Sequence, residues 1–338
     1  MRKVVYVGNR LNKTGKTITS IETLGRLLAN EGFDMVLTSS KKNKLHRLID
    51  MLLTVYRNRK SADYVLIDTY STLNFYYAFL VSKLCIRFKV PYIPILRGGD
   101  LPNRLAKSPK KCNTIFDNAL MSIAPSEYLN SAFKEAGYTK VMFIPNNIEV
   151  DLYEYKEREG IKPNLLWVRS FRDIYNPTLA IEVLQLLKEN YPEAKLCMIG
   201  PQADKSFEET KSLATKYDLL DSIEFTGMLT KEAWREKSVS SSIFINTTNF
   251  DNTPISLIEA MALGLPVVST NVGGIPFLIS DQKDGILVKK SDALEMKQAI
   301  IELIDNPKRA NKIALNARNK VENFDWKIIK KKWLEVLK

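Results

Sequence analysis

We begin from residues 243–288, which read IFINTTNFDNTPISLIEAMALGLPVVSTNVGGIPFLISDQKDGILV. The apolar run Ile243–Ile245 is typical of a buried strand. Thr253 offers a side-chain oxygen suited to a helix N-cap, and Pro254 suits the first helical position. These residues predict a helix from Pro254 to about Leu263.

The second part of this stretch predicts a return to the sheet. Gly264 is typical of a helix end, and Leu265–Ser269 is typical of another buried strand. Gly273 and Gly274 then predict a flexible turn before a short helix. The whole stretch is therefore typical of a strand–helix–strand unit of an α/β domain.

Two acidic residues, Asp251 and Glu259, flank the expected helix N-terminus. Free backbone N–H groups and the positive end of the helix dipole suit a phosphate group, and carboxylates accept hydrogen bonds from sugar hydroxyls. The residues alone leave a second interpretation open. In that interpretation Asp251 is a cap and Glu259 lies on a solvated helix face.

The same residues resemble the donor-binding signature of the retaining nucleotide-sugar glycosyltransferases of family 4. The matching segments are Glu259–Met261, Gly264–Val268 and Gly273–Pro276. The first acid of the signature is usually Glu, and here it is Asp251, which is one methylene shorter. The resemblance is strong over residues 165–288, and in the first half of the chain it concerns only the architecture.

The resemblance implies an α/β fold with two Rossmann-like domains, the B-type glycosyltransferase fold. It places a UDP- or GDP-linked sugar donor on the C-terminal domain and the acceptor on the N-terminal domain. The implied reaction transfers the sugar with retention of configuration, without a metal ion or another cofactor. The implied acceptor is a glycan or a polyprenyl-diphosphate-linked glycan, as in cell-surface polysaccharide biosynthesis.

Length and composition agree with a globular protein of two domains. The chain has 338 residues, of which 45% are hydrophobic and 26% are charged. Its three scattered cysteines favour a reducing compartment, and its single histidine, His46, excludes a histidine-rich metal site or a histidine-based triad. Met1–Lys3 leads into only a short apolar run, unlike a signal peptide, so we expect a cytoplasmic location.

The positive charge is confined to one half of the chain. Residues 1–150 contain 23 Lys and Arg against 11 Asp and Glu, a balance of +12, whereas residues 151–338 contain 27 of each. A basic and apolar segment in this half predicts an interfacial helix on an anionic membrane surface; the residues are Lys41, Lys42, Lys44, Arg47, Leu48, Ile49, Leu52 and Leu53. A solvated basic face is the open alternative. We expect no nucleic-acid partner, because no aromatic and basic reading motif accompanies the charge.

Strands alternate with helical segments in two series, which predicts two parallel sheets. The first series of expected strands is Val4–Gly8, Met35–Thr38, Tyr64–Asp68, Tyr92–Leu96, Leu120–Ala124 and Val141–Ile144. The second is Leu165–Val168, Leu196–Ile199, Ile223–Phe225, Ile243–Ile245, Pro266–Ser269 and Ile286–Val288. We expect domains at 1–150 and 151–318, a charged linker over 148–163, and a C-terminal helix over 319–338 that crosses back to the first domain.

Arg169 and Arg172 follow the first expected strand of the second domain, where ligands of parallel sheets bind. Arginine grips phosphate through a planar fork, so we expect one of the two to clamp the diphosphate. The sequence leaves open which one does so. Lys205 and Lys231 are the next candidates for this role.

Two loops of the first domain are candidates for the acceptor site. The segment Gly15–Thr17 is not a P-loop, because the position five residues before Gly15 is Arg10 and not glycine. Arg97–Asp100 follows the fourth expected strand. Asp100 is expected either to accept a hydrogen bond from a sugar hydroxyl or to cap the next helix.

These arguments assign the following residues. We expect Asp251, Arg169, Arg172 and Asp100 to be catalytic. We expect the donor to contact Glu259, Asn252, Thr253, Pro254, Ile255, Gly200, Gly227, Gly273 and Gly274. We expect the acceptor to contact Gly8, Gly15, Lys16, Thr17, Arg97, Gly98 and Gly99. Two other functions are kept as alternatives, a nucleotide-sugar epimerase and a non-catalytic nucleotide-sugar-binding protein.

Overall fold

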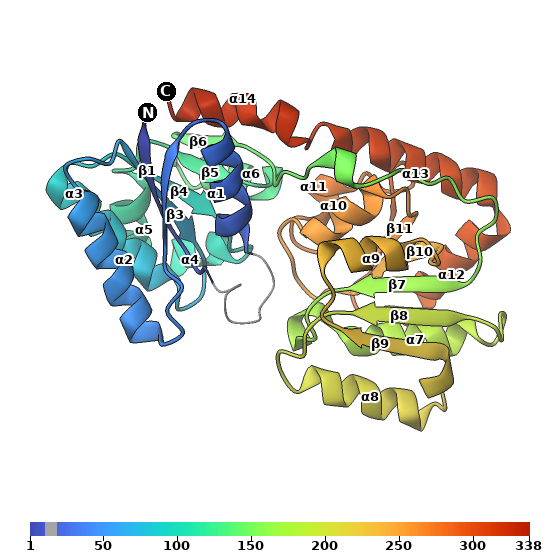
Figure 1. Cartoon of the computed structure of the whole chain (residues 1–338). Coiled ribbons are helices and arrows are strands. Elements are labelled where there is room, and N and C mark those ends of the chain that lie inside the picture. Colours follow the sequence, from blue (N-terminus) through green and yellow to red (C-terminus); the bar gives the residue numbers. More distant parts are fainter. Residues whose placement is uncertain (11–18) are drawn as a thin grey trace. The chain divides into compact units, whose positions relative to one another are not determined.

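The structure, a computed structural model, describes residues 1–10 and 19–338. The chain forms two compact units, one of residues 1–145 with 331–338 and one of residues 146–330 (Figure 1). The sequence candidates Gly15, Lys16 and Thr17 lie outside the described residues.

The first unit is built on a six-stranded parallel sheet with the strand order β2-β1-β3-β4-β5-β6. Its strands are β1 (Lys3–Val7), β2 (Asp34–Thr38), β3 (Tyr64–Thr69), β4 (Tyr92–Leu96), β5 (Ser122–Ala124) and β6 (Val141–Phe143). Its helices are α1 (Ser20–Asn30), α2 (Lys44–Asn58), α3 (Phe75–Phe88), α4 (Leu101–Lys107), α5 (Pro109–Phe116) and α6 (Glu127–Glu135).

The second unit has a six-stranded parallel sheet with the order β12-β11-β10-β7-β8-β9. Its strands are β7 (Asn164–Val168), β8 (Lys195–Ile199), β9 (Ile223–Gly227), β10 (Ile243–Asn246), β11 (Val267–Thr270) and β12 (Ile286–Val288). Its α-helices are α7 (Pro177–Leu187), α8 (Ser206–Lys216), α9 (Lys231–Ser238), α10 (Ile255–Ala262), α11 (Ile275–Leu278), α12 (Ala293–Asp305) and α13 (Pro307–Glu322). Its 3₁₀ turns are η2 (Val150–Leu152), η3 (Asp173–Tyr175) and η4 (Leu220–Ser222).

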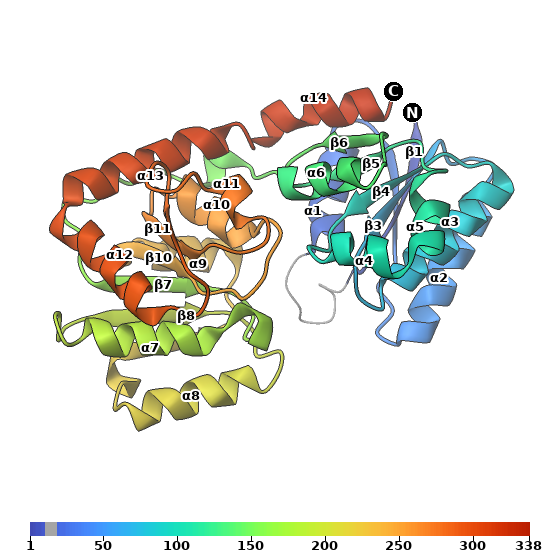
Figure 2. The ribbon, with the colours of Figure 1, turned by 180° about the vertical axis from the view of Figure 1, so that it is seen from behind.

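Helices cover both faces of the second sheet. Successive side chains of a strand point to opposite faces, so each buried strand packs against helices on both sides. Leu165 and Trp167 of β7 pack with α7 and α12, seen in front of the sheet in Figure 2. Leu166 packs on the other face with α9, α10 and α13, and α9 is seen in front of the sheet in Figure 1. The α/β class and the two parallel sheets predicted from the sequence are confirmed.

The last helix, α14 (Trp326–Val336), contains the boundary between the two units. In the second unit, the Trp326 backbone N–H donates to the Ile148 carbonyl oxygen at 2.9 Å. In the first unit, Tyr64 Oη donates to the Lys338 carbonyl oxygen at 3.0 Å. Within the described residues, no helix is both long and apolar enough to cross a bilayer.

The charged segment 148–163 is not an exposed linker, which corrects the sequence-based expectation. It lies within the second unit, and Tyr153 and Arg158 are buried there. The Arg158 guanidinium donates to the carbonyl oxygens of Lys156 and Gly264 at 2.6 and 2.7 Å. It also donates to those of Ser241 and Leu263. A charge count could not reveal this, because the charged group is buried by pairing with backbone carbonyls.

Replacing Arg158 with methionine should lower the free energy of unfolding by about 3 kcal/mol, because it leaves buried carbonyl oxygens without a donor. Urea unfolding followed by tryptophan fluorescence measures this, since Trp167, Trp234 and Trp326 lie in the second unit. Lys211→Met, at an exposed position of α8, is the control and should change the midpoint little. Equal effects of the two substitutions would contradict the structural role of Arg158.

Candidate functional site

The candidate site lies where the strand order of the second sheet reverses. From β7 the chain adds β8 and β9 on one side and then β10, β11 and β12 on the other. The segments that follow β7 and β10 therefore leave the sheet in opposite directions, which is the position where parallel sheets bind ligands. Arg169 follows β7, and residues 247–254 follow β10.

The Arg169 guanidinium and the Asp251 carboxylate form an ion pair, and each side chain is only 15% exposed. The Tyr175 ring lies beneath the guanidinium, 4.2 Å from its Cζ atom. Burial lowers the pKa of Arg169, and the Tyr175 hydroxyl opposes this shift. Arg169 Nη2 and Asp251 Oδ2 pair with each other, whereas Arg169 Nε is buried and has no hydrogen-bond partner among the described residues.

The structure separates the two arginines that the sequence could not distinguish. Arg169 is directed at Asp251, whereas Arg172 is exposed and lies near Asp204, whose pKa it helps to lower. Lys205 is also exposed and pairs with Glu209 of its own helix. Of the sequence candidates for the diphosphate clamp, Arg169 pairs with the predicted site residue Asp251, and Lys231 pairs with the predicted site residue Glu259.

The carboxylate of Glu259 is buried, and its two oxygens have different surroundings. Its Oε1 atom accepts a 2.6 Å hydrogen bond from Tyr153 Oη and forms an ion pair with Lys231. Its Oε2 atom is buried and has no hydrogen-bond partner among the described residues. Burial, and then the charge of Glu259, raise the pKa of Tyr153, so the phenol stays protonated and remains a donor.

Sequence reasoning missed the role of Tyr153 and did not connect Lys231 with Glu259. Tyr153 lies in the segment that the sequence predicts to be a linker, and Lys231 is among the next candidates for the phosphate clamp. In the structure both hold Glu259, from 106 and 28 residues away along the chain. No local pattern marks such partners. The only signal in the sequence was a pair of tyrosines, Tyr153 and Tyr155, in a charged segment.

Glycines line this site because other backbone segments come very close to them. A Cβ atom on Gly273 would overlap the Asp251 carbonyl oxygen, and one on Gly274 would overlap that of Asn252. The Gly274 backbone N–H donates to the Asp251 carbonyl oxygen at 2.9 Å. Gly200 lies equally close to the Arg169 carbonyl group, whereas Gly227 has a φ of +70° and open space around it.

Helix α10 begins one residue later than predicted, at Ile255, and Pro254 is its N-cap residue. Thr253 is therefore not the cap, which corrects the prediction. Its Oγ1 atom is buried and has no hydrogen-bond partner among the described residues, while its carbonyl oxygen accepts from Asn146 Nδ2 at 3.2 Å. Proline has no N–H for the preceding side chain to bind, so Thr253 is free to face another group.

Three buried polar atoms of this site have no hydrogen-bond partner among the described residues, namely Arg169 Nε, Thr253 Oγ1 and Glu259 Oε2. Buried polar groups are almost always paired, so such a cluster indicates that a polar ligand supplies the missing partners. The set contains donors and acceptors, which suits a ligand that carries both anionic oxygens and hydroxyl groups. Within the described residues, no three His, Cys, Asp or Glu side chains are grouped to hold a metal ion.

In the first unit, the acceptor-site candidate Arg97 belongs to a hydrogen-bond network with Asp68 and Tyr6. Arg97 Nε donates to Asp68 Oδ1 at 3.0 Å, and Tyr6 Oη donates to the same oxygen at 2.9 Å. Gly8 and Gly98 are close-approach positions, since a Cβ atom would lie 2.7 Å from Asp68 Oδ2 or 2.5 Å from the Ser71 nitrogen. The network fixes the loop that carries Gly98 and Gly99 at the carboxyl edge of β4.

Asp100 is the residue before α4, but its side chain makes no capping hydrogen bond. It is exposed and accepts a bond from Asn103 Nδ2 at 2.5 Å. The carboxylate therefore lies at the surface of the first unit.

Comparison with known proteins agrees with this architecture. Two parallel α/β units of this kind define the B-type glycosyltransferase fold, and solved structures match it over the whole chain. Anabaena Alr3699/HepE, solved in complex with UDP and glucose, superposes with a TM-score of 0.79 at 16% identity and covers 100% of this chain and 99% of its own. Residues 154–320 match the family of glycosyl transferases group 1. The second unit is thus a group 1 glycosyltransferase domain, and the chain has the B-type fold.

Curated relatives match mainly this second unit. An uncharacterized glycosyltransferase of Haemophilus influenzae is 28% identical over 158 residues, which is 46% of this chain and 44% of that protein. The putative colanic acid biosynthesis glycosyltransferase WcaL of Escherichia coli is 29% identical over 170 residues, 47% of this chain and 41% of that protein. These matches span less than half of either relative.

Gly273→Ala should destabilise the second unit more than Gly227→Ala does. Both positions have positive φ, which disfavours alanine by about 1 kcal/mol. Only at Gly273 would the new methyl group also overlap the Asp251 carbonyl oxygen, which should remove roughly 2 kcal/mol more. Urea unfolding of the two variants measures the difference, and equal losses would show that the turn and the Asp251 loop do not pack as described.

Proposed function

We propose that this chain is a glycosyltransferase of the retaining type, which moves a sugar from a nucleoside diphosphate sugar to an acceptor without a metal ion. The observation that carries the proposal is the group of three buried polar atoms of Arg169, Thr253 and Glu259 that have no hydrogen-bond partner among the described residues, beside the buried Arg169–Asp251 ion pair. The match of the second unit to group 1 supports it. So does the resemblance of residues 243–288 to the donor-binding signature of family 4. So does the fold shared with HepE, which was solved with UDP and glucose.

The donor is proposed to lie across the segments that follow β7 and β10. Arg169 and the N-terminus of α10 bind the diphosphate, because both present donors to anionic oxygens. Glu259 lies one turn into α10, about 6 Å along its axis. Its open Oε2 atom accepts hydrogen bonds from the ribose hydroxyls, while Tyr153 and Lys231 hold Oε1.

Asp251 precedes the helix and is proposed to accept hydrogen bonds from the transferred sugar. In the structure its carboxylate pairs with Arg169. A diphosphate that takes over the guanidinium would release Asp251 toward the sugar hydroxyls. Its short side chain then makes it a determinant of which sugar is accepted.

The reaction that we propose is the one that the resemblance to family 4 implies. The bond between the anomeric carbon and the diphosphate oxygen breaks, and an acceptor oxygen bonds to that carbon on the same face. The acceptor's proton passes to the leaving phosphate oxygen. Arg169 stabilises the negative charge that grows on this leaving group, which is most effective in a buried site.

We place the acceptor site on the first unit, at the loops of Gly8 and Arg97–Gly99. The acceptor class is proposed to be a growing glycan, including one linked to a polyprenyl diphosphate, in polysaccharide biosynthesis. The name of the relative WcaL supports that class. The three free cysteines agree with a cytoplasmic location, and the basic first half agrees with work at an anionic membrane surface.

Incubation with a panel of UDP- and GDP-sugars tests the activity through slow hydrolysis of the donor. At least one donor should be hydrolysed, and Arg169→Ala should lower that rate by at least about a hundredfold, because it removes a group that stabilises the leaving phosphate. Arg172→Ala is the matched control and should stay within about twofold, since Arg172 is exposed. A donor that binds but is never hydrolysed would instead favour a non-catalytic sugar-nucleotide-binding protein.

Glu259→Gln should weaken binding of the nucleoside diphosphate by about ten- to a hundredfold. The substitution keeps the shape but removes charge-assisted hydrogen bonds of about 1.5–3 kcal/mol. Isothermal titration calorimetry measures the affinity, and Glu209→Gln, at an exposed position of α8, is the control. Unchanged affinity in Glu259→Gln would remove Glu259 from the ribose site.

A further inference from the structure

Exposed apolar side chains are concentrated on one face of the first unit. Of the nineteen large exposed apolar residues in the described part of the chain, eight lie between residues 45 and 86. They are Leu45, Ile49, Leu53, Tyr56, Leu73, Tyr76, Leu80 and Ile86. On α2 they recur every three or four residues, so they form a stripe along one side of the helix. Leu45 and Leu73 are 64% and 73% exposed. A concentration of this kind marks an interaction surface.

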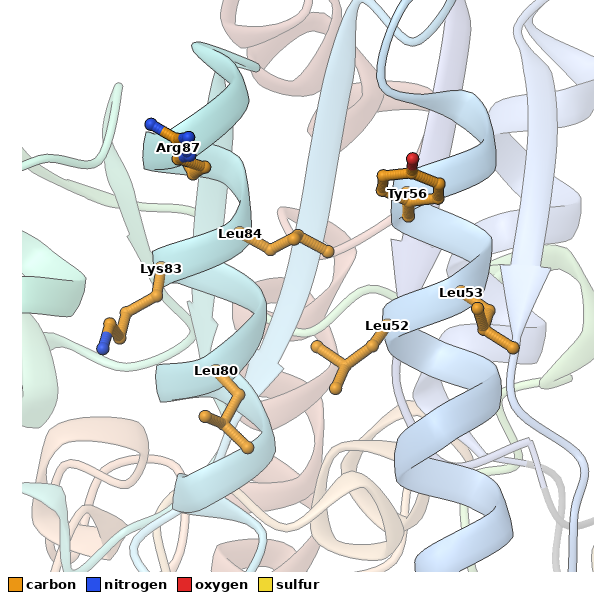
Figure 3. Close-up of a pocket in the computed structure, with 7 residues that line it drawn as sticks. All are labelled: Leu52, Leu53, Tyr56, Leu80, Lys83, Leu84 and Arg87. Atoms are coloured by element: carbon orange, nitrogen blue, oxygen red, sulfur yellow. The ribbon is translucent and has the colours of Figure 1, made fainter.

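A groove of about 440 Å³ runs between α2 and α3 on this face. Its lining residues are Leu52, Leu53, Tyr56, Leu80, Lys83, Leu84 and Arg87. Figure 3 shows Leu52 of α2 and Leu84 of α3 pointing into the space between the helices, while Lys83 points away from it. The groove thus has an apolar floor and cationic groups at its rim. We call α2, α3 and this groove the α2–α3 face.

Charge on this part of the chain is almost entirely positive. Residues 41–89 contain ten Lys and Arg and three Asp. Each of the three aspartates is engaged within the unit: Asp50 with Thr38, Asp63 with the Lys3 backbone, and Asp68 with Tyr6 and Arg97. Eight of the ten cationic side chains are exposed beside the apolar ones, while Arg47 and Arg59 are half-buried and donate to backbone carbonyl oxygens.

We propose that the α2–α3 face docks on an anionic phospholipid bilayer, with its leucines among the acyl chains and its lysines and arginines at the headgroups. The combination of exposed leucines and a net positive charge is what such an interface attracts. A second copy of the chain would bring two positive faces together. A nucleic acid would leave the leucines unburied. The 15-residue helix α2 is about 22 Å long and would lie along the surface.

The inference rests on the proposed function only in that a lipid-linked acceptor would be found at such a surface. Lipid binding and donor hydrolysis are therefore measured separately. Co-sedimentation of the full chain uses vesicles of phosphatidylcholine alone or mixed with phosphatidylglycerol, at low and high salt and without a sugar donor. We expect binding to the anionic vesicles that salt weakens, and at least about tenfold weaker binding to the neutral ones.

Two variants test the two components of the surface. Lys83→Gln with Arg87→Gln should weaken binding about 25-fold, since each basic residue contributes about fivefold. Leu53→Gln with Leu80→Gln should weaken it at least about tenfold while donor hydrolysis without vesicles stays at the wild-type rate. The matched controls are Lys308→Gln with Lys312→Gln, and Leu315→Gln, all exposed on α13, and these should bind as the wild type does.

Insertion of the apolar stripe is tested by fluorescence. Leu53→Trp should be quenched by phospholipids brominated on their acyl chains, and Leu315→Trp should not. Equal binding to neutral and anionic vesicles, wild-type binding by both test variants, or no quenching would each overturn the proposal. A dimer in solution that Leu53→Gln with Leu80→Gln abolishes would also overturn it, because a second copy would then cover the groove.

Discussion

The second unit is arranged around one constraint, which is the burial of charged side chains at one edge of its sheet. Removing an ionised group from water costs several kcal/mol unless partners replace the water. Glu259 receives two partners at one oxygen, from Tyr153 and Lys231, and Arg169 receives Asp251 and the Tyr175 ring. Glu259 Oε2 and Arg169 Nε are held in place but have no hydrogen-bond partner among the described residues. The folded unit is therefore organised in advance for a polar ligand.

Buried charged side chains have different partners at the sheet edges of the two units, which agrees with the roles proposed for these units. In the first unit, Arg97, Asp68 and Tyr6 hydrogen-bond to one another at the carboxyl edge of the sheet. That network stiffens a loop, whereas at the carboxyl edge of the second sheet Arg169 Nε and Glu259 Oε2 have no hydrogen-bond partner among the described residues. The first unit carries its excess charge at the surface instead, where it can attract an anionic partner.

Much of the fold was predictable because parallel strands are buried on both faces and so appear as short apolar runs. All twelve predicted strands are present, with ends shifted by at most two residues. The errors occurred where a residue's role depends on distant backbone. Segment 148–163 looked like a linker because its charges were counted without the carbonyl groups that surround Arg158. Thr253 looked like a helix cap, although the helix begins after Pro254.

The candidate site, too, was predictable from the sequence only in part. Residues 243–288 by themselves indicated the acids Asp251 and Glu259 and the glycines, because strand, helix and turn signals are local and keep their order along the chain. The choice of Arg169 over Arg172, and of Tyr153 and Lys231 as partners of Glu259, came only from the folded chain. Those contacts join separate loops at one sheet edge, and the direction in which each side chain points is set by packing that no local pattern encodes.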